Sequence, residues 1–177
     1  MRTITASRCT LEPQLATHAC EMFVVLSDPA IYEFENSPPP NEEWLKQRYE
    51  RLEARRSGDN TELWLNWVIR LPNGKLAGYV QATVLADRSA YVAYEINSQQ
   101  WRQGIGSSAV QAVLDELTKH HGTESFIAVL KAGNYRSEGL LRKLGFVPAS
   151  AHEAARHRDE PDELVMVKAG AVAANAA

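Results

Sequence analysis

The chain has 177 residues, of which 45% are hydrophobic, and a formal net charge of −3. This length supports one well-buried core, so we expect a single domain over residues 1–168 and a flexible Ala-rich tail over 169–177. A mildly acidic chain argues against a nucleic-acid partner, because neutralising phosphates needs clustered Lys and Arg. No apolar run approaches the roughly 18 to 20 residues of a membrane span, which predicts a cytoplasmic protein with no membrane partner.

The first third of the chain predicts one strand and two helices. β-Branched residues with partial alternation favour a strand over 3–13. A helix over 15–29 is expected to end at the Asp28-Pro29 pair, since proline disfavours helical geometry in the residue before it. Asn41 suits the N-cap of a second helix. Side chains of that helix recur at helical spacing, namely Trp44, Leu45, Arg48, Tyr49 and Leu52.

The middle of the chain predicts three antiparallel strands. They cover roughly 63–71, 75–86 and 89–96, which are dense in Trp, Val, Ile, Leu and Tyr. The pair Asn73-Gly74 suits a tight turn between the first two strands, because both residues tolerate positive φ.

The C-terminal part predicts alternating helices and strands. The segment 104–120 has the stripe of an amphipathic helix, 124–132 reads as a buried strand, 134–145 as a short helix and 163–168 as a last strand. The segment ASAHEAARHRDEPDE before the last strand is expected to be a polar loop. Such a mixed order predicts an α/β or α+β sheet with helices packed on it.

The stretch WRQGIGSSAV, residues 101–110, places two glycines just before a helix. A glycine turn that opens a helix presents unpaired backbone N–H groups beside the positive end of the helix dipole, which favours an anion such as phosphate. Gly104 and Gly106 would let oxygens approach the main chain, and Ser107 and Ser108 could add hydroxyl donors. The alternative is that the glycines only make the turn.

The same stretch also matches the dinucleotide-binding pattern G-x-G-x-x-A, with Glu124 twenty residues after Gly104. That pattern requires the glycines to follow a strand immediately, in a parallel βαβ unit. Here the seven residues NSQQWRQ separate Ile96 from Gly104. A nicotinamide-dependent enzyme is therefore kept only as an alternative.

Two motifs together resemble the GNAT superfamily of acetyl-CoA-dependent N-acetyltransferases. The first is W-R-Q-G-I-G after the strand YVAYEIN, and the second is KAGNYRSEGLLRKLGF, with Gly106 and Asn134 28 residues apart. The second motif is similar to the family pattern N-x-x-S-x-x-L-x-x-K-L-G-F, here Asn134, Ser137, Leu140, Lys143, Leu144, Gly145 and Phe146. The resemblance covers roughly residues 5–168. Trp101 and the LSDP stretch look most like the branch of ribosomal-protein-alanine N-acetyltransferases.

The resemblance implies a fold and a cosubstrate. The fold is an α/β (α+β) one, with a mixed, mostly antiparallel central sheet, splayed parallel strands and helices on both faces. Acetyl-CoA would lie where the strands YVAYEIN and ESFIAVL splay apart, and no metal is expected. The resemblance implies that acetyl-CoA is bound mostly by backbone groups, with one side-chain contact from Asn134 to pantetheine. The residues expected to bind it are Ile96, Asn97, Ser98, Arg102, Gln103, Gly104, Ile105, Gly106, Ser107 and Asn134.

The reaction needs a base, because an amine with a pKa of about 8 to 10 must lose a proton before it attacks a thioester. Glu95 is the first candidate, although it could equally be a solvent-facing strand residue. Glu33 and Glu35 come next, and with Tyr32 and Phe34 they form the expected acceptor-binding segment.

A proton donor for the leaving thiolate is less well defined. Many relatives have a tyrosine four residues after the motif serine, but this chain has Leu141 there. Ser137 is then the candidate, with Tyr135 behind it, although Ser137 could simply satisfy the first turn of its helix.

These observations predict an acetyl-CoA-dependent enzyme that acetylates a primary amine, either a protein N-terminus or a small amine. The alternative is a catalytically inactive CoA-binding module that serves as a sensor or scaffold, which the missing tyrosine at position 141 keeps open. A monomer and a homodimer are both compatible with the sequence.

Overall fold

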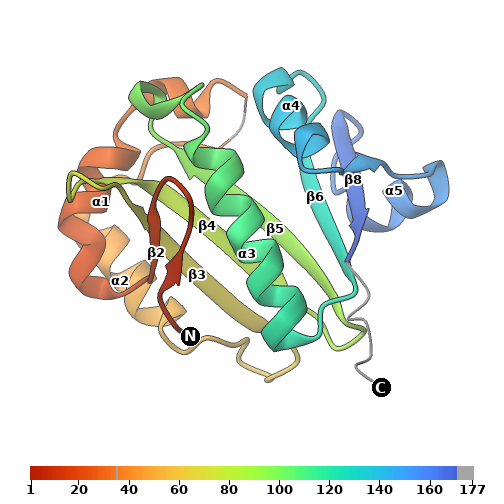
Figure 1. Ribbon diagram of the computed structural model, residues 1–177, viewed down its shortest axis with the longest axis horizontal. Coiled ribbons are helices and arrows are strands. Elements are labelled where there is room, and N and C mark those ends of the chain that lie inside the picture. The colour runs from red at the N-terminus through yellow and green to blue at the C-terminus, as the bar shows by residue number, and fades with distance from the viewer. Residues whose placement is uncertain (35, 171–177) are drawn as a thin grey trace.

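The computed structural model describes residues 1–34 and 36–170, which form a mixed eight-stranded sheet with helices on both faces (Figure 1). The strands are β1 (Ile4–Thr5), β2 (Thr10–Pro13), β3 (Leu63–Arg70), β4 (Leu76–Val84), β5 (Ser89–Ile96), β6 (Ser125–Lys131), β7 (Val147–Pro148) and β8 (Glu163–Ala169). Their order across the sheet is β1-β2-β3-β4-β5-β6-β8-β7. The helices are α1 (Ala19–Leu26), α2 (Glu42–Leu52), α3 (Ile105–His121), α4 (Tyr135–Lys143) and α5 (Ala151–His157), with short 3-10 helices η1 (Ala16–His18), η2 (Pro29–Tyr32) and η3 (Ser98–Gln100).

One strand pair among the described residues is parallel, and it separates along its length. β5 and β6 pair only from Ser89 to Tyr91 on one strand and from Ser125 to Ile127 on the other. Beyond those residues β5 and β6 diverge toward α4, as Figure 1 shows. The other named pairs are antiparallel, and η3 and the glycine turn intervene between β5 and α3. This topology confirms the expected fold class and rules out the Rossmann alternative.

Two hydrophobic cores fix the helices on opposite faces of the sheet. The apolar stripe of α3 packs on the face that carries Trp67 and Val80, both fully buried. Helices α1 and α2 pack on the other face against Val68 and Leu76. The alternation of Trp67 and Val68 between the two cores is the period of two that a strand buried on both faces must show.

Most elements agree with those expected from the sequence, and three do not. The three central strands and the helix after Gly104 are confirmed to within about two residues at each end. The expected first strand over 3–13 is a hairpin of β1 and β2, and the expected helix over 15–29 is interrupted as η1, α1 and η2. The expected polar loop contains α5, whose capping box joins Ser150 and Glu153.

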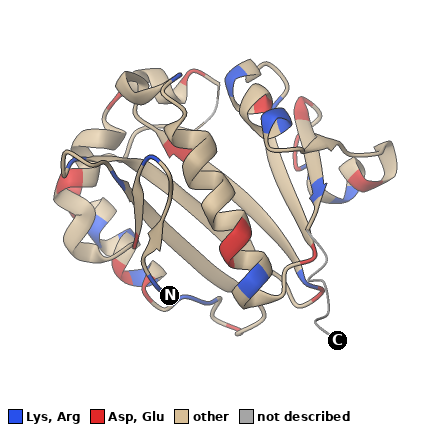
Figure 2. Ribbon diagram, viewed as in Figure 1, with Lys and Arg blue, Asp and Glu red and all other residues tan. Residues whose placement is uncertain are grey.

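Charges are interspersed over the fold, as Figure 2 shows for Lys and Arg against Asp and Glu. Within the described residues, no helix is both long and apolar enough to cross a membrane. The predicted tail over 169–177 lies mostly outside the described residues, and the boundary at 168 stays a prediction.

Candidate active site

A cavity of about 850 Å³ opens where β5 and β6 separate. One side is formed by the glycine turn and α4, and the other by η2, α2 and β4. Because the edge of β5 has lost its partner there, residues from both faces of this strand line the same cavity, including the adjacent Tyr94 and Glu95. Successive side chains of a strand point to opposite faces, so β5 contributes to two different walls.

The glycine turn presents three amides at the N-terminus of α3. Gly104 has φ of 75°, which glycine adopts without strain, and its carbonyl accepts the first helical hydrogen bond, from Ser108 N at 3.0 Å. The N–H groups of Ile105, Gly106 and Ser107 therefore precede the first turn of hydrogen bonds. Gly104, Gly106 and Ser107 line the cavity, so this helix start can bind an anion within it.

Gly106 has a packing role as well. A Cβ atom at this position would lie 2.7 Å from Leu140 Cδ1 and 2.8 Å from Ile96 Cδ1. The helix start is thus pressed against both α4 and the end of β5. Gly106 therefore serves the packing of the turn, and the amides beside it have the geometry to bind an anion.

Arg8 lies over the turn, which sequence reasoning missed. Its Nε atom lies 3.0 Å from the position that a Cβ of Gly104 would occupy. Arg8, Arg102 and Lys143 line a hollow beside the turn, and they come from the β1–β2 hairpin, the turn itself and the end of α4. Ninety-six residues separate Arg8 from Gly104, so no local pattern could have paired them.

The backbone after β5 is arranged differently from what the sequence led us to expect. The N–H of Asn97 donates to Ala77 O at 2.9 Å, and the N–H of Ser98 donates to Asp28 Oδ2 at 2.7 Å. These two amides are therefore already used within the protein. Ile96 lines the cavity, and its carbonyl accepts from the indole of Trp101 at 2.8 Å.

Asn134 and Ser137 lie on the α4 wall of the cavity. Asn134 Oδ1 caps the helix by accepting from Ser137 N at 3.1 Å. The Ser137 hydroxyl lies 2.9 Å from the hydroxyl of Tyr94, which reaches across from β5. Leu141, at the position where relatives carry tyrosine, is only 1% exposed and belongs to the core. Tyr94 thus supplies a phenol that sequence reasoning did not consider.

Glu95 lies on the opposite wall among tyrosines. It faces Tyr79 in the β4–β5 pair, and Asn36 Nδ2 lies 3.5 Å from its carboxylate. Burial, reinforced by the charge of Glu95, raises the pKa of Tyr32, Tyr49 and Tyr79 above the usual value of 10. These three phenols stay protonated at neutral pH. Glu95 is thus a carboxylate in the cavity with neutral hydroxyl groups around it.

Arg136 gathers three of the predicted site residues around it, namely Glu33, Phe34 and Tyr135. Arg136 forms an ion pair with Glu33, and its guanidinium lies 5.1 Å from the Phe34 ring and 4.4 Å from the Trp101 ring. Tyr135 is 60% exposed and accepts a hydrogen bond from Arg136 at 2.9 Å. Glu33 is thus occupied by Arg136 and does not line the cavity.

Of the other two acceptor candidates, the structure describes one. Tyr32 lines the cavity and donates to Leu26 O at 2.8 Å, whereas Glu35 lies outside the described residues. Within residues 1–34 and 36–170, no group of three or more His, Cys, Asp or Glu side chains could hold a metal ion.

The cleft thus has separated strands, a turn with unpaired amides on one wall and a carboxylate on the other. A family model described as the acetyltransferase (GNAT) domain matches residues 8–147. The chain therefore belongs to the GNAT family, and the enzyme class expected from the sequence, an acetyl-CoA-dependent N-acetyltransferase, is confirmed. No match was found among the curated proteins.

Solved structures agree with this fold over nearly the whole chain. A ribosomal-protein-S5-alanine acetyltransferase from Vibrio fischeri is 19% identical with a TM-score of 0.76, covering 95% of this chain and 96% of its own. RimL, a ribosomal L7/L12 α-N-protein acetyltransferase in complex with CoA, is 13% identical with a TM-score of 0.79, covering 94% and 97%. A spermidine N-acetyltransferase from Vibrio cholerae, in complex with CoA and spermine, is 16% identical with a TM-score of 0.75, covering 93% and 96%.

Proposed function

We propose that this enzyme binds acetyl-CoA between β5 and α4 and transfers its acetyl group to a primary amine of a small molecule or peptide. The observation that carries this proposal is the separation of β5 from β6 after Tyr91, beside the glycine turn. The CoA bound in the RimL structure supports it, since that chain shares this fold. We place the enzyme in the cytoplasm, without a metal or a nucleic-acid partner, as a monomer or homodimer.

The donor wall would bind through its backbone. The amides of Ile105, Gly106 and Ser107 suit a diphosphate, and Arg8 and Arg102 add positive charge beside it. Pantetheine amides would meet the edge of β5 that lost its partner after Tyr91, as an added strand does. That edge, rather than the occupied amides of Asn97 and Ser98, is the surface available for such pairing.

The acceptor wall would supply the base. A neutral amine attacks the thioester carbonyl, so the protonated amine must first give up a proton. Glu95 would accept that proton, directly or through a water molecule. The neutral phenols of Tyr32 and Tyr79 nearby leave the carboxylate as the proton acceptor of this group.

The hydroxyl pair of Tyr94 and Ser137 would assist departure of the thiolate. The two oxygens are 2.9 Å apart at the junction of β5 and α4, where a proton can pass from one to the other. Because a thiol has a pKa of roughly 8.5, the thiolate needs only modest help to leave. Tyr94 would then take the role for which Leu141 is unsuited.

Ligand-dependent stability followed by a rate assay tests this function. We expect CoA and acetyl-CoA, but not NAD, to raise the unfolding temperature, because a ligand at 100 times its Kd adds about 2.7 kcal/mol to stability. Thiol release from acetyl-CoA should then depend on an added amine. Stabilisation by CoA with no thiol release for any of a broad panel of amines and N-terminal peptides would instead support the inactive CoA-binding module.

A further inference from the structure

A row of amide side chains crosses the sheet beneath α2. The N–H of Gln14 donates to Asn66 O at 2.9 Å, Asn66 faces Gln81 between β3 and β4, and Gln81 faces Ala93 between β4 and β5. Residues opposite each other in antiparallel strands project to the same face. Asn66 lies two residues from Val68, which packs against α1 and α2, so this row lies on the α2 face.

The row starts beside the carboxylate that we assign as base. Ala93 and Glu95 lie on the same face of β5, two residues apart. From Ala93 to Gln14 the row spans three strand spacings of about 4.8 Å, which is roughly 14 Å. Gln81 and Gln14 both line the cavity, so the cavity runs from the reacting end of β5 across the sheet.

Within the described residues, two hydrogen-bond donors along this path have no partner, one at its far end and one on α2 within reach of the charge of Glu95. Gln14 and Tyr49 are each 3% exposed, and neither Gln14 Nε2 nor the Tyr49 hydroxyl has a hydrogen-bond partner within the described residues. Both side chains line the cavity. Buried donors in native proteins are almost always paired with protein, water or ligand. These two atoms therefore call for a hydrogen-bond acceptor in the cavity.

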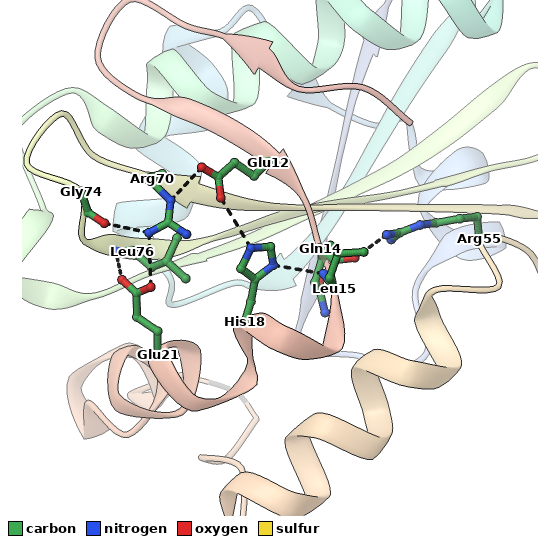
Figure 3. Close-up of polar contacts among 9 residues, drawn as sticks. All are labelled: Glu12, Gln14, Leu15, His18, Glu21, Arg55, Arg70, Gly74 and Leu76. Atoms are coloured by element: carbon green, nitrogen blue, oxygen red, sulfur yellow. Dashed lines mark hydrogen bonds and ion pairs between the residues drawn. The ribbon is translucent and has the colours of Figure 1, made fainter.

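The charge beside Gln14 determines which kind of hydrogen-bond acceptor can bind there. Figure 3 shows Arg55 reaching the main-chain oxygen of Gln14, and its second nitrogen, Nη1, is also buried without a partner. Burial lowers the pKa of Arg55 and raises that of Tyr49, so at neutral pH both groups still carry their protons. Beside Gln14, a guanidinium and a neutral amide donor favour an oxygen atom and disfavour an ammonium group.

We propose that Gln14 and Tyr49 form an acceptor subsite that binds carbonyl oxygens along the substrate while its amine lies at Glu95. The substrate class is a primary amine with an amide or carboxylate further along its chain, rather than a polyamine. The subsite rests on the proposed function for its position relative to the base. Its chemistry rests on the unpaired donors alone.

Matched sets of ω-amino amides, ω-amino acids and diamines of increasing chain length test the subsite. We expect kcat/KM for the best amide or acid to exceed that of the equally long diamine by about tenfold or more, because a buried donor left unpaired weakens the wrong ligand. A preference for the amide would indicate a peptide chain, and a preference for the carboxylate a free amino acid. Equal rates for all three sets would overturn the proposal.

Substitutions at Gln14 provide the second arm. Gln14→Leu should abolish the preference without loss of stability, since it removes a buried donor that has no partner. Gln14→Glu, which replaces the donor with a carboxylate, should shift the preference toward diamines. Gln47→Leu on the exposed side of α2 is the matched control and should change neither. A preference that survives in Gln14→Leu would contradict the subsite.

Calorimetry of the CoA-loaded protein separates this inference from the proposed function. An ω-amino amide should bind to the wild type and about tenfold more weakly to Tyr49→Phe, whether or not acetylation occurs. Gln14- and Tyr49-dependent binding without turnover would contradict the proposed function and leave the subsite standing. Acetylation at an unchanged rate in both variants would support the proposed function and contradict the subsite.

Discussion

The two walls of the cleft are built from different parts of the chain. The donor wall is mostly backbone, with the amides of Ile105 to Ser107 and the edge of β5 after Tyr91. The acceptor wall consists of side chains, including Glu95 of β5, Tyr49 of α2 and Gln14 of the segment between β2 and η1. A wall of backbone tolerates changes of side chain but not of backbone path. The side-chain wall should respond in the opposite way.

Loss of the base should have the largest effect. Glu95→Gln keeps the shape of the side chain but removes the proton acceptor, so we expect kcat to fall by about a hundred- to ten-thousandfold. Stabilisation by CoA should be unchanged, because Glu95 lies on the other wall. Glu50→Gln on the exposed side of α2 is the matched control. A full rate in Glu95→Gln would remove this residue from the mechanism.

Enlarging Gly106 should damage the backbone wall instead. In Gly106→Val the Cβ atom alone would lie under 3 Å from Leu140 Cδ1 and Ile96 Cδ1, so these side chains or the start of α3 must shift. We expect a loss of about 1 to 3 kcal/mol in the free energy of unfolding and loss of stabilisation by CoA. Denaturant unfolding and thermal shifts measure both. Gly58→Val, in open space, should change neither, and normal CoA binding in Gly106→Val would contradict a backbone site here.

The same contrast explains what could be predicted from the sequence. The donor wall depends on short-range patterns, such as Gly104 before a helical stripe and Asn134 as the cap of α4, and both were identified with their elements. The acceptor wall depends on register across strands. Gln14 and Gln81 belong to one row only because Asn66 of β3 lies between them, and no periodicity within either segment reports that arrangement.

Two further misses have different causes. Tyr94 reaches Ser137 across the separated strands, a contact that only the tertiary structure creates. Helix α5, by contrast, was readable, since Ser150 and Glu153 have the spacing of a capping box and were overlooked in a polar segment.

Tyr94 and Ser137 join β5 to α4 on the donor side, and their removal should have an intermediate effect. We expect Tyr94→Phe to lower kcat by about tenfold, with CoA binding retained, because a thiolate leaves with little assistance. Adding Ser137→Ala should cost little more, since two hydroxyls that act as one pair are not additive. Tyr91→Phe is the matched control, because its hydroxyl contacts His157 at 2.7 Å, where β5 and β6 are still paired. Additive losses would show that the two hydroxyls act separately.

The smallest effect should arise beside the far end of the acceptor wall, at His18. Its Nδ1 accepts from Leu15 N at 3.1 Å, and its Nε2 lies 3.5 Å from Glu12, which also pairs with Arg70 (Figure 3). Burial outweighs the attraction of Glu12 and lowers the pKa of His18 below its usual 6.5. The unfolded chain therefore takes up the proton first, so this contribution to stability is complete above pH 6.5 and decreases as the pH falls below it.

Urea unfolding at about pH 7.5 and about pH 5.5 measures this dependence. In His18→Gln the free energy of unfolding should depend less on pH. His152→Gln changes an exposed histidine of α5 and should leave this dependence as in the wild type. Stabilisation by CoA should change equally with pH in the wild type and in His18→Gln, because His18 is not among the described residues that line the cavity. A change in CoA affinity caused by His18→Gln would show that the two walls are coupled through the sheet, and the division between them would no longer hold.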